Sequence, residues 1–154
     1  VVKADAYGHG AVQVARKLET LGADYLAVSS LDEAMELRGK GIFMPILVLG
    51  HTPADQVKNL IKYHVTQAVS CESKALEYEA EAAKLGERLK VHIKLDTGMG
   101  RIGFLPSDES IGEIKKIKDL ENIEVYNLKG VRITETDKLT RGIYIINGNK
   151  TFVK

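Results

Sequence analysis

The run Pro45-Ile46-Leu47-Val48-Leu49 decides the fold class of this chain of 154 residues. An extended strand made of these residues carries apolar side chains on both faces, so both faces must be buried. Sheets with two buried faces are typically parallel and covered by helices. Similar apolar runs occur at residues 25–28, 66–69 and 91–95, and the chain opens at Val1 within what reads as another strand.

Segments with the apolar spacing of helices separate these runs. Thr52 is predicted to cap one such helix and Pro53 to open it. Ser107 and Asp108 are predicted to cap another. The predicted helices occupy approximately residues 12–21, 34–37, 53–61, 73–89 and 108–120.

The alternating β and α units are about 20–25 residues long, which suits a (β/α)8 barrel and a doubly wound sheet equally well. Composition does not separate these two folds. A complete barrel needs about 200 residues or more, so this chain holds only about five units. The sequence therefore predicts an α/β segment over residues 1–122.

From residue 123 the pattern changes to short β runs. Asn147-Gly148 stands between β-branched segments and favours a two-residue hairpin turn, because both turn positions need a positive φ. We expect a short antiparallel β meander over residues 123–154, appended to the α/β segment. Residues 123–128 also suit a sixth strand of the main sheet.

Composition excludes several classes of function. The 22 Lys and Arg residues balance 21 Asp and Glu residues, and the net charge of +1 gives no reason to expect nucleic acid or an anionic membrane as a partner. No apolar run approaches the roughly 20 residues that span a bilayer. One cysteine, Cys71, excludes an internal disulfide, and the four histidines lack a shared ligand spacing, so no metal site is expected. The start of the chain lacks the profile of a secretory signal, so the expected location is the cytoplasm.

The first candidate site is the segment Lys3-Ala4-Asp5-Ala6-Tyr7-Gly8-His9-Gly10. In a parallel α/β barrel, residues after a strand line the ligand site. A partly desolvated lysine there can present a neutral amine for Schiff-base chemistry, and glycines let the backbone bend beside a ligand. The alternative interpretation is a solvated lysine at a strand end, followed by an ordinary loop.

The second candidate site is the glycine-spaced segment from Lys94 to Gly103. Arg101 offers a planar fork that suits a carboxylate. Lys94 lies in an apolar strand and needs a compensating partner, because an isolated buried ammonium is costly. The alternative interpretation is a glycine-rich turn with an exposed arginine and a lysine whose head group reaches solvent.

Together, the two segments resemble hallmark segments of the bacterial alanine racemases. Residues 1–10, with the run Ala6-Tyr7-Gly8-His9-Gly10, resemble the segment that attaches pyridoxal phosphate in that family, and residues 94–104 resemble its second hallmark segment. Further similar segments follow in the family's order, at residues 23–28, 31–34 and 45–50.

This resemblance covers roughly residues 1–125. It implies a partial (β/α)8 TIM-type barrel of about five βα units, the N-terminal part of the family's cofactor-binding barrel. It also implies an isomerase that uses pyridoxal 5'-phosphate to interconvert L-alanine and D-alanine for peptidoglycan synthesis.

The resemblance implies a role for each matching residue. Lys3 would form the internal Schiff base with pyridoxal phosphate and act as one of two bases at the substrate Cα. Tyr7 would support the cofactor near its phosphate, and Val1 and Leu49 would be its apolar neighbours. Arg101 would pair with the substrate carboxylate or with the phenol of the opposing catalytic tyrosine.

Lys94 has a further implied role, because this lysine is often carbamylated in the family. A carbamate replaces the cation by an anion, which would orient Arg101.

Parts of the family's pattern are not recognisable after about Val125. A complete racemase continues through further strands, which bind the phosphate, and a C-terminal domain, whose tyrosine acts as the second base in the partner subunit. Residues 126–130 also replace the histidine that follows the family's sixth strand. The resemblance also implies a homodimer. Because one base and most of the phosphate site have no counterpart here, we expect this chain on its own to have weak activity or none.

Two rival interpretations remain at this point. One is a non-catalytic barrel fragment or fusion, whose open sheet edges favour oligomerisation. The weaker one is another Schiff-base barrel enzyme such as an aldolase, which the run from Ala6 to Gly10 argues against.

The tail, residues 123–154, is similar to C-terminal β modules that serve as type IX secretion sorting signals in secreted Bacteroidetes proteins. The similarity rests on residues 125–132 and 142–150. A hairpin that merely caps the open edge of the sheet explains the same residues equally well.

Overall fold

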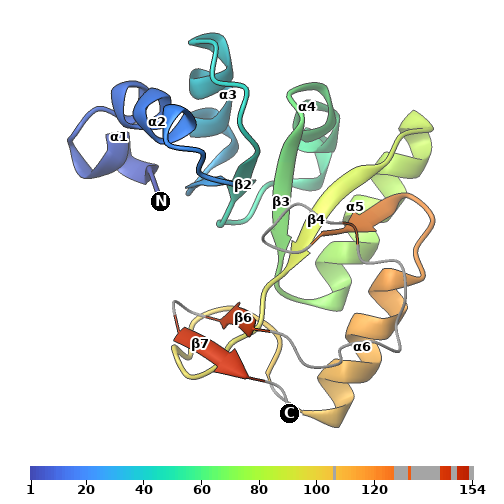
Figure 1. Cartoon of the computed structure of the whole chain (residues 1–154). Helices are drawn as coiled ribbons and strands as arrows, with labels where there is room; N and C mark the ends of the chain where they lie inside the picture. The colour runs from blue at the N-terminus through green and yellow to red at the C-terminus, as the bar shows by residue number, and fades with distance from the viewer. Residues whose placement is uncertain (106, 127–131, 133–142, 147–148, 153–154) are drawn as a thin grey trace.

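The computed structural model describes residues 1–105, 107–126, 132, 143–146 and 149–152 of the chain. Its main sheet has five parallel strands (Figure 1), namely β1 (Leu26–Val28), β2 (Ile46–Val48), β3 (Val65–Val69), β4 (Leu89–Ile93) and β5 (Ile123–Val125). The helices are α1 (Lys3–Tyr7), α2 (Ala11–Thr20), α3 (Leu31–Gly39), the 3-10 turn η1 (Ala54–Gln56), α4 (Val57–Lys62), α5 (Glu72–Leu85) and α6 (Asp108–Lys118). A separate antiparallel pair consists of β6 (Ile143–Ile146) and β7 (Asn149–Phe152).

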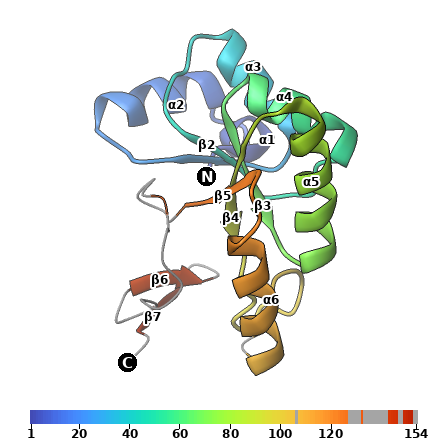
Figure 2. The ribbon, with the colours of Figure 1, turned by 90° about the vertical axis from the view of Figure 1, so that its right-hand side faces the viewer.

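The strand order separates the two folds that the sequence left open. The strands lie side by side in chain order, β1-β2-β3-β4-β5, whereas a doubly wound sheet reverses its order at a switch point. Figure 2 shows α4, α5 and α6 in a row along one side of β3, β4 and β5. This arrangement confirms the prediction of a partial barrel built from βα units.

The core lies between the helices and the strand residues that point toward them. Alternate residues of a strand point to opposite faces, so one set of side chains meets the helices. The core is apolar and fully buried at its centre, where the strands contribute Leu26, Val28, Ile46, Val48, Val69 and Val91, and the helices contribute Ala34, Leu37, Leu60, Ala75 and Ala82.

Most predicted helices form close to their expected bounds. The Ser107 hydroxyl accepts the N–H of Ser110 at 3.3 Å, so this residue caps α6 as predicted. The prediction for Thr52 is wrong: its hydroxyl donates to Oε1 of Gln67 at 2.6 Å, and no side chain caps the 3-10 turn after Pro53. Gln67 is fully buried on β3, and its amide oxygen needs the partner that Thr52 supplies.

The start of the chain also differs from its prediction. The backbone N–H of Val2 donates to the carbonyl of Ala27 at 2.8 Å, so Val1 and Val2 run beside β1. These two residues are not assigned to a strand, and residues from Lys3 to Tyr7 form the short helical segment α1 instead of continuing as one.

The end of the chain confirms the hairpin. Ile143 pairs with Phe152 and Ile146 with Asn149, in the antiparallel register that encloses Asn147-Gly148. The turn residues themselves lie outside the described part of the chain. β5 pairs in parallel with β4, so residues 123–125 form the further strand of the main sheet that the sequence also allowed. The division into segments 1–122 and 123–154 remains a prediction.

Arg38, near the end of α3, binds the loops that enter β2 and β3. Its guanidinium donates to the carbonyls of Ile42, Met44, Tyr63 and His64 at distances from 2.7 to 3.1 Å. Burial lowers the pKa of Arg38, while the nearby carboxylate of Glu19 acts in the opposite direction. One planar group thus satisfies four backbone acceptors in two loops.

Replacing Arg38 by lysine should destabilise the chain, because an ammonium cannot reach four carbonyls that surround a planar fork. We expect the free energy of unfolding to fall by about 2–4 kcal/mol in urea denaturation. Arg16→Lys is the matched control, since Arg16 makes one long hydrogen bond of 3.3 Å to Lys40. Equal losses in the two variants would contradict the role assigned to Arg38.

Candidate functional site

The candidate residues lie where the parallel strands end. Val2 is hydrogen-bonded to Ala27, so Lys3 stands level with the end of β1. The N–H of Leu49 donates to the carbonyl of Val28 at 2.9 Å, and the N–H of Lys94 donates to that of Val69 at 2.8 Å. Lys3, Leu49 and Lys94 therefore share the carboxyl edge of the sheet, where parallel α/β proteins place their ligands.

The backbone after Lys3 forms a left-handed helical turn. Ala4, Asp5, Ala6 and Tyr7 have φ values from 49° to 56°, a region that residues with a Cβ atom disfavour. Each such residue costs about 1–2 kcal/mol relative to a right-handed conformation. Backbone strain of this kind persists only where the surroundings fix it, and it clusters at functional sites.

Several contacts fix this turn. The N–H of Ala4 donates to Oε1 of Glu33 at 2.7 Å, and Oδ1 of Asp5 accepts the N–H of Ala11 at 2.6 Å. The side chain of Ala6 is buried. Gly8 and Gly10 follow with φ values of 86° and 88°, so the backbone bend that the sequence predicted at these glycines is present.

Lys3 carries an amine with few local partners. Its side chain is half-buried, and its Nζ lies 5.9 Å from the centre of the Tyr7 ring. Within the described part of the chain, this amine makes no hydrogen bond or ion pair. Val1 and Tyr7 are each 63% exposed, and Leu49 is half-buried. The structure thus brings Lys3 and Tyr7 together, with Val1 adjacent in the chain.

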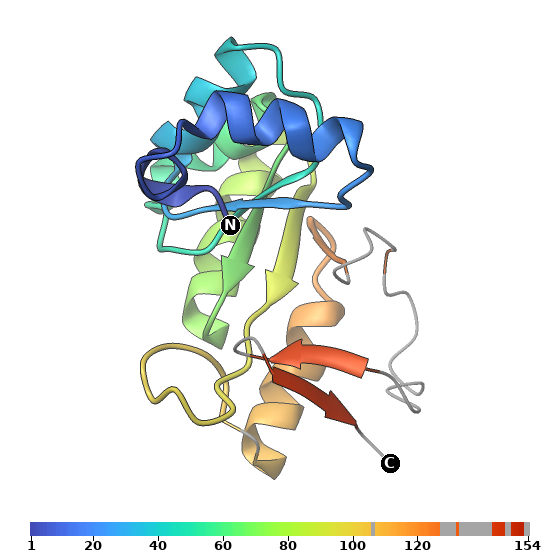
Figure 3. The same ribbon diagram turned by 60° about the vertical axis from the view of Figure 1, so that its left-hand side comes forward.

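The second hallmark segment is a loop organised by Asp96. The buried Asp96 carboxylate accepts the N–H groups of Gly98 and Gly100 at 3.0 Å and that of Arg101 at 3.1 Å. These hydrogen bonds, that of Gly100 foremost, lower the pKa of Asp96. Figure 3 shows this loop beyond the end of β4. Sequence reasoning missed Asp96, although an aspartate before a glycine-rich turn is a known turn signal.

Lys94 joins the same loop from the strand side. Its Nζ donates to the carbonyl of Ile102, the residue after Arg101, at 3.0 Å. This carbonyl is a polar partner of the kind that a lysine in an apolar strand requires. At Gly103, an added Cβ would lie 2.7 Å from the backbone nitrogen of Asp96, so only glycine fits this close approach. Arg101 is exposed and held through its backbone. Among the described residues, no hydrogen bond or ion pair joins Arg101 to Lys3.

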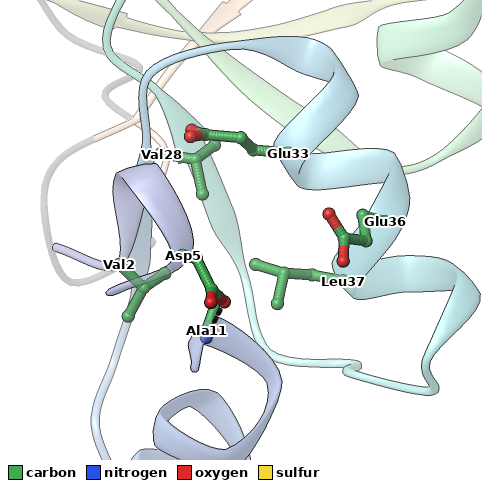
Figure 4. Close-up of a pocket in the computed structure, with 7 residues that line it drawn as sticks. All are labelled: Val2, Asp5, Ala11, Val28, Glu33, Glu36 and Leu37. Atoms are coloured by element: carbon green, nitrogen blue, oxygen red, sulfur yellow. Dashed lines mark hydrogen bonds between the residues drawn. The ribbon is translucent and has the colours of Figure 1, made fainter. Parts of the chain in front are cut away.

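A cavity of about 290 Å³ lies between the segment around α1 and helix α3. Figure 4 shows Val2 and Asp5 on one side of it and Glu33, Glu36 and Leu37 on the other. Neither Lys3 nor Arg101 lines this cavity. We therefore place the candidate site at the strand ends rather than here.

A buried polar group that the sequence did not point to lies on β4. His92 is 6% exposed, its ring is tilted against that of Tyr25 at 5.2 Å, and the Tyr25 hydroxyl lies 3.2 Å from Oγ1 of Thr66. Within the described residues, Nε2 of His92 has no hydrogen-bond partner. Burial lowers the pKa of His92 to about 4.

Stability should therefore depend on His92 between pH 4 and 6.5. In this range the unfolded chain binds a proton that the folded chain does not, so the free energy of unfolding falls as the pH falls. The loss approaches about 3 kcal/mol at pH 4. Urea denaturation of His92→Leu across this range should show a flatter profile. The exposed His9→Ala is the control, and a flattening of equal size in that variant would remove His92 as the cause.

Asp96→Asn should loosen the loop, because an amide group accepts on one atom only and its NH₂ opposes an N–H donor. Hydrogen exchange of the Gly98, Gly100 and Arg101 amides should become several-fold faster at constant pH. The amide of Gly22, which is bound to the carbonyl of Glu19 in another turn, should keep its rate. Unchanged exchange at all three loop amides would show that Asp96 does not hold the loop.

The described residues hold neither a candidate membrane span nor a cluster of metal ligands. None of their helices is both long enough and apolar enough to cross a membrane. Among the same residues, no three His, Cys, Asp or Glu side chains gather where they could hold a metal ion.

Most of the chain is similar to proteins of one known family. The family described as "Alanine racemase, N-terminal domain" matches residues 1–131. Alanine racemase 1 of Clostridium acetobutylicum is 52% identical over 123 residues, which cover 80% of this chain and 32% of that protein. The chain thus spans about a third of the length of the curated relatives it matches.

Solved structures extend the comparison to the fold. A structure of alanine racemase from Clostridium difficile 630 has a TM-score of 0.78 and 47% identity, and covers 82% of this chain and 33% of that one. A histidine racemase from Leuconostoc mesenteroides has a TM-score of 0.72 and 32% identity, and covers 79% and 33%.

Proposed function

Because the chain belongs to the family of the alanine racemase N-terminal domain, we propose that it forms the cofactor-attaching part of an enzyme that uses pyridoxal 5'-phosphate to interconvert L-alanine and D-alanine. The observation that carries this proposal is the Lys3 amine. Lys3 stands at the carboxyl edge of the sheet, immediately before a strained turn, and its amine makes no ion pair among the described residues.

The residues around Lys3 suit attachment of this cofactor. The carboxylates of Asp5 and Glu33 accept backbone N–H groups and do not pair with the lysine, which leaves its amine available to an aldehyde. Val1 and Leu49 place apolar side chains at the same edge, and Tyr7 adds an aromatic hydroxyl. When bound, the cofactor's pyridine ring draws electron density from the substrate Cα and makes its proton acidic.

Residues of this chain would then move the proton and orient the reacting groups. Lys3 would exchange a proton with the substrate Cα on one face. The Arg101 fork would pair with the substrate carboxylate or with the phenol of the opposing tyrosine. Lys94 holds the same loop through Ile102, and a carbamate at Lys94 would keep an N–H for that carbonyl while presenting an anion to orient Arg101.

The finer parts of the proposal rest on the family resemblance. They are a homodimer in which the partner's C-terminal domain supplies the second base, a cytoplasmic location and a supply of D-alanine for peptidoglycan. Without a second base, residues 1–154 alone should have weak activity or none. The alternative is a non-catalytic barrel fragment or fusion, to which the type IX sorting resemblance of the tail would belong.

The substrate is proposed to be alanine, although a similar fold also occurs in a histidine racemase. The high identity to alanine racemases supports alanine. Assays should therefore offer both amino acids, and preferential turnover of histidine would overturn this choice.

Adding pyridoxal phosphate to the purified chain should produce an absorbance band in the violet that borohydride bleaches. Peptide mapping after reduction should place the label on Lys3. Lys3→Ala should lose the label, and Lys3→Arg should do so while keeping the positive charge. Lys40→Ala, at an exposed lysine after α3, should retain it. A folded chain that takes up no label would favour the non-catalytic alternative, and a label on another lysine would remove Lys3 from its role.

A further inference from the structure

We propose that Glu33, at the start of α3, is a positioning residue for Lys3. Its carboxylate holds the backbone immediately after Lys3 and so fixes the point from which the lysine side chain extends. The inference rests on the proposed function, since it concerns Lys3 as the lysine that attaches the cofactor.

Three hydrogen bonds carry the inference. Oε1 of Glu33 accepts the N–H of Ala4 at 2.7 Å, and Oε2 accepts the N–H and hydroxyl of Ser29 at 2.7 and 2.8 Å. One carboxylate therefore joins the left-handed turn, the connection after β1 and helix α3. It receives charge-assisted hydrogen bonds, which are stronger than neutral ones.

Helix α3 gives this carboxylate a rigid base. Leu31, Ala34 and Leu37 are buried in the core, so the helix cannot shift without disturbing packing. Burial would raise the pKa of Glu33, but the hydrogen bonds from Ala4, Ser29 and Ser30 together lower it below its ordinary value. The group therefore stays an anion at neutral pH and keeps accepting the N–H of Ala4.

Helix capping explains only part of this geometry. The Ser30 hydroxyl accepts the N–H of Glu33 at 3.4 Å, and a glutamate three residues after a capping serine usually reaches back to the start of its own helix. Oε1 instead binds Ala4, 29 residues earlier in the chain. A cap does not require this contact, whereas a strained turn beside a reactive lysine does require an anchor.

Loss of the hydrogen bond between Glu33 and Ala4 should change the position of Lys3. Without Glu33, the N–H of Ala4 loses its acceptor, and the turn can relax toward right-handed or extended conformations that lack its unfavourable φ values. The amine would then be displaced from the edge of the sheet. Small displacements of a reacting group lower its effectiveness steeply.

Glu33→Gln tests the inference, because it keeps the size of the side chain and removes its charge. The affinity for pyridoxal phosphate, measured from the violet band at a temperature where all variants are folded, should fall about tenfold. Glu19→Gln is the matched control, since Glu19 accepts the N–H of Met44 at 3.2 Å, another contact distant in sequence but without link to Lys3. Its affinity should stay within about twofold of the unchanged chain.

Two further variants separate positioning from capping. Ser30→Ala removes the helix cap but keeps the contact with Ala4, so its cofactor affinity should remain unchanged although its stability falls. Glu33→Asp keeps the charge and shortens the reach to Ala4, so its affinity should fall as in Glu33→Gln. This second variant decides the matter if Glu33→Gln does not fold.

The outcomes distinguish this inference from the proposed function. Normal cofactor affinity in Glu33→Gln and Glu33→Asp, with Lys3 still labelled, would overturn the positioning role and leave the proposed function standing. An equal loss in Ser30→Ala would also overturn it, because capping would then explain the effect. If the unchanged chain takes up no label at all, the proposed function fails and the inference falls with it.

Discussion

Parallel pairing of the strands in chain order is the constraint on which the rest of the structure depends. Since β1 to β5 all run in the same direction, every strand ends at the same edge of the sheet. Segments that are about ninety residues apart in the sequence, Lys3 and the loop after Lys94, therefore follow strands at one edge. The apolar side chains that force this pairing have no chemical role themselves, but they determine where the polar ones lie.

At that edge, carboxylates bound to backbone N–H groups shape the two hallmark segments. Glu33 and Asp5 hold the turn after Lys3, and Asp96 holds the loop that carries Arg101. Each of these anions accepts backbone N–H groups and so orders the chain beside Lys3 or Arg101. The Lys3 amine, which makes no hydrogen bond or ion pair among the described residues, remains available to a ligand.

The sequence predicted the architecture because its signals are local. Apolar runs such as residues 45–49 marked the parallel strands, and Ser107 marked the start of α6. The position of Lys3 at a strand end also followed from its neighbours. The left-handed turn did not, because Ala4 and Ala6 disfavour positive φ individually and the turn depends on an acceptor 29 residues away. The same limit applied to Thr52, whose partner lies on β3, and to His92, whose ring packs against that of Tyr25 from another part of the chain.

Helix α3 is bound at both ends to opposite edges of the sheet. Glu33 near its start holds the turn beside Lys3, and Arg38 near its end holds the loops that enter β2 and β3. The helix therefore connects the two edges of the sheet through side-chain hydrogen bonds. The loops at one edge of the sheet and the turn at the other are therefore attached to the same buried helix, although they lie far apart in the sequence.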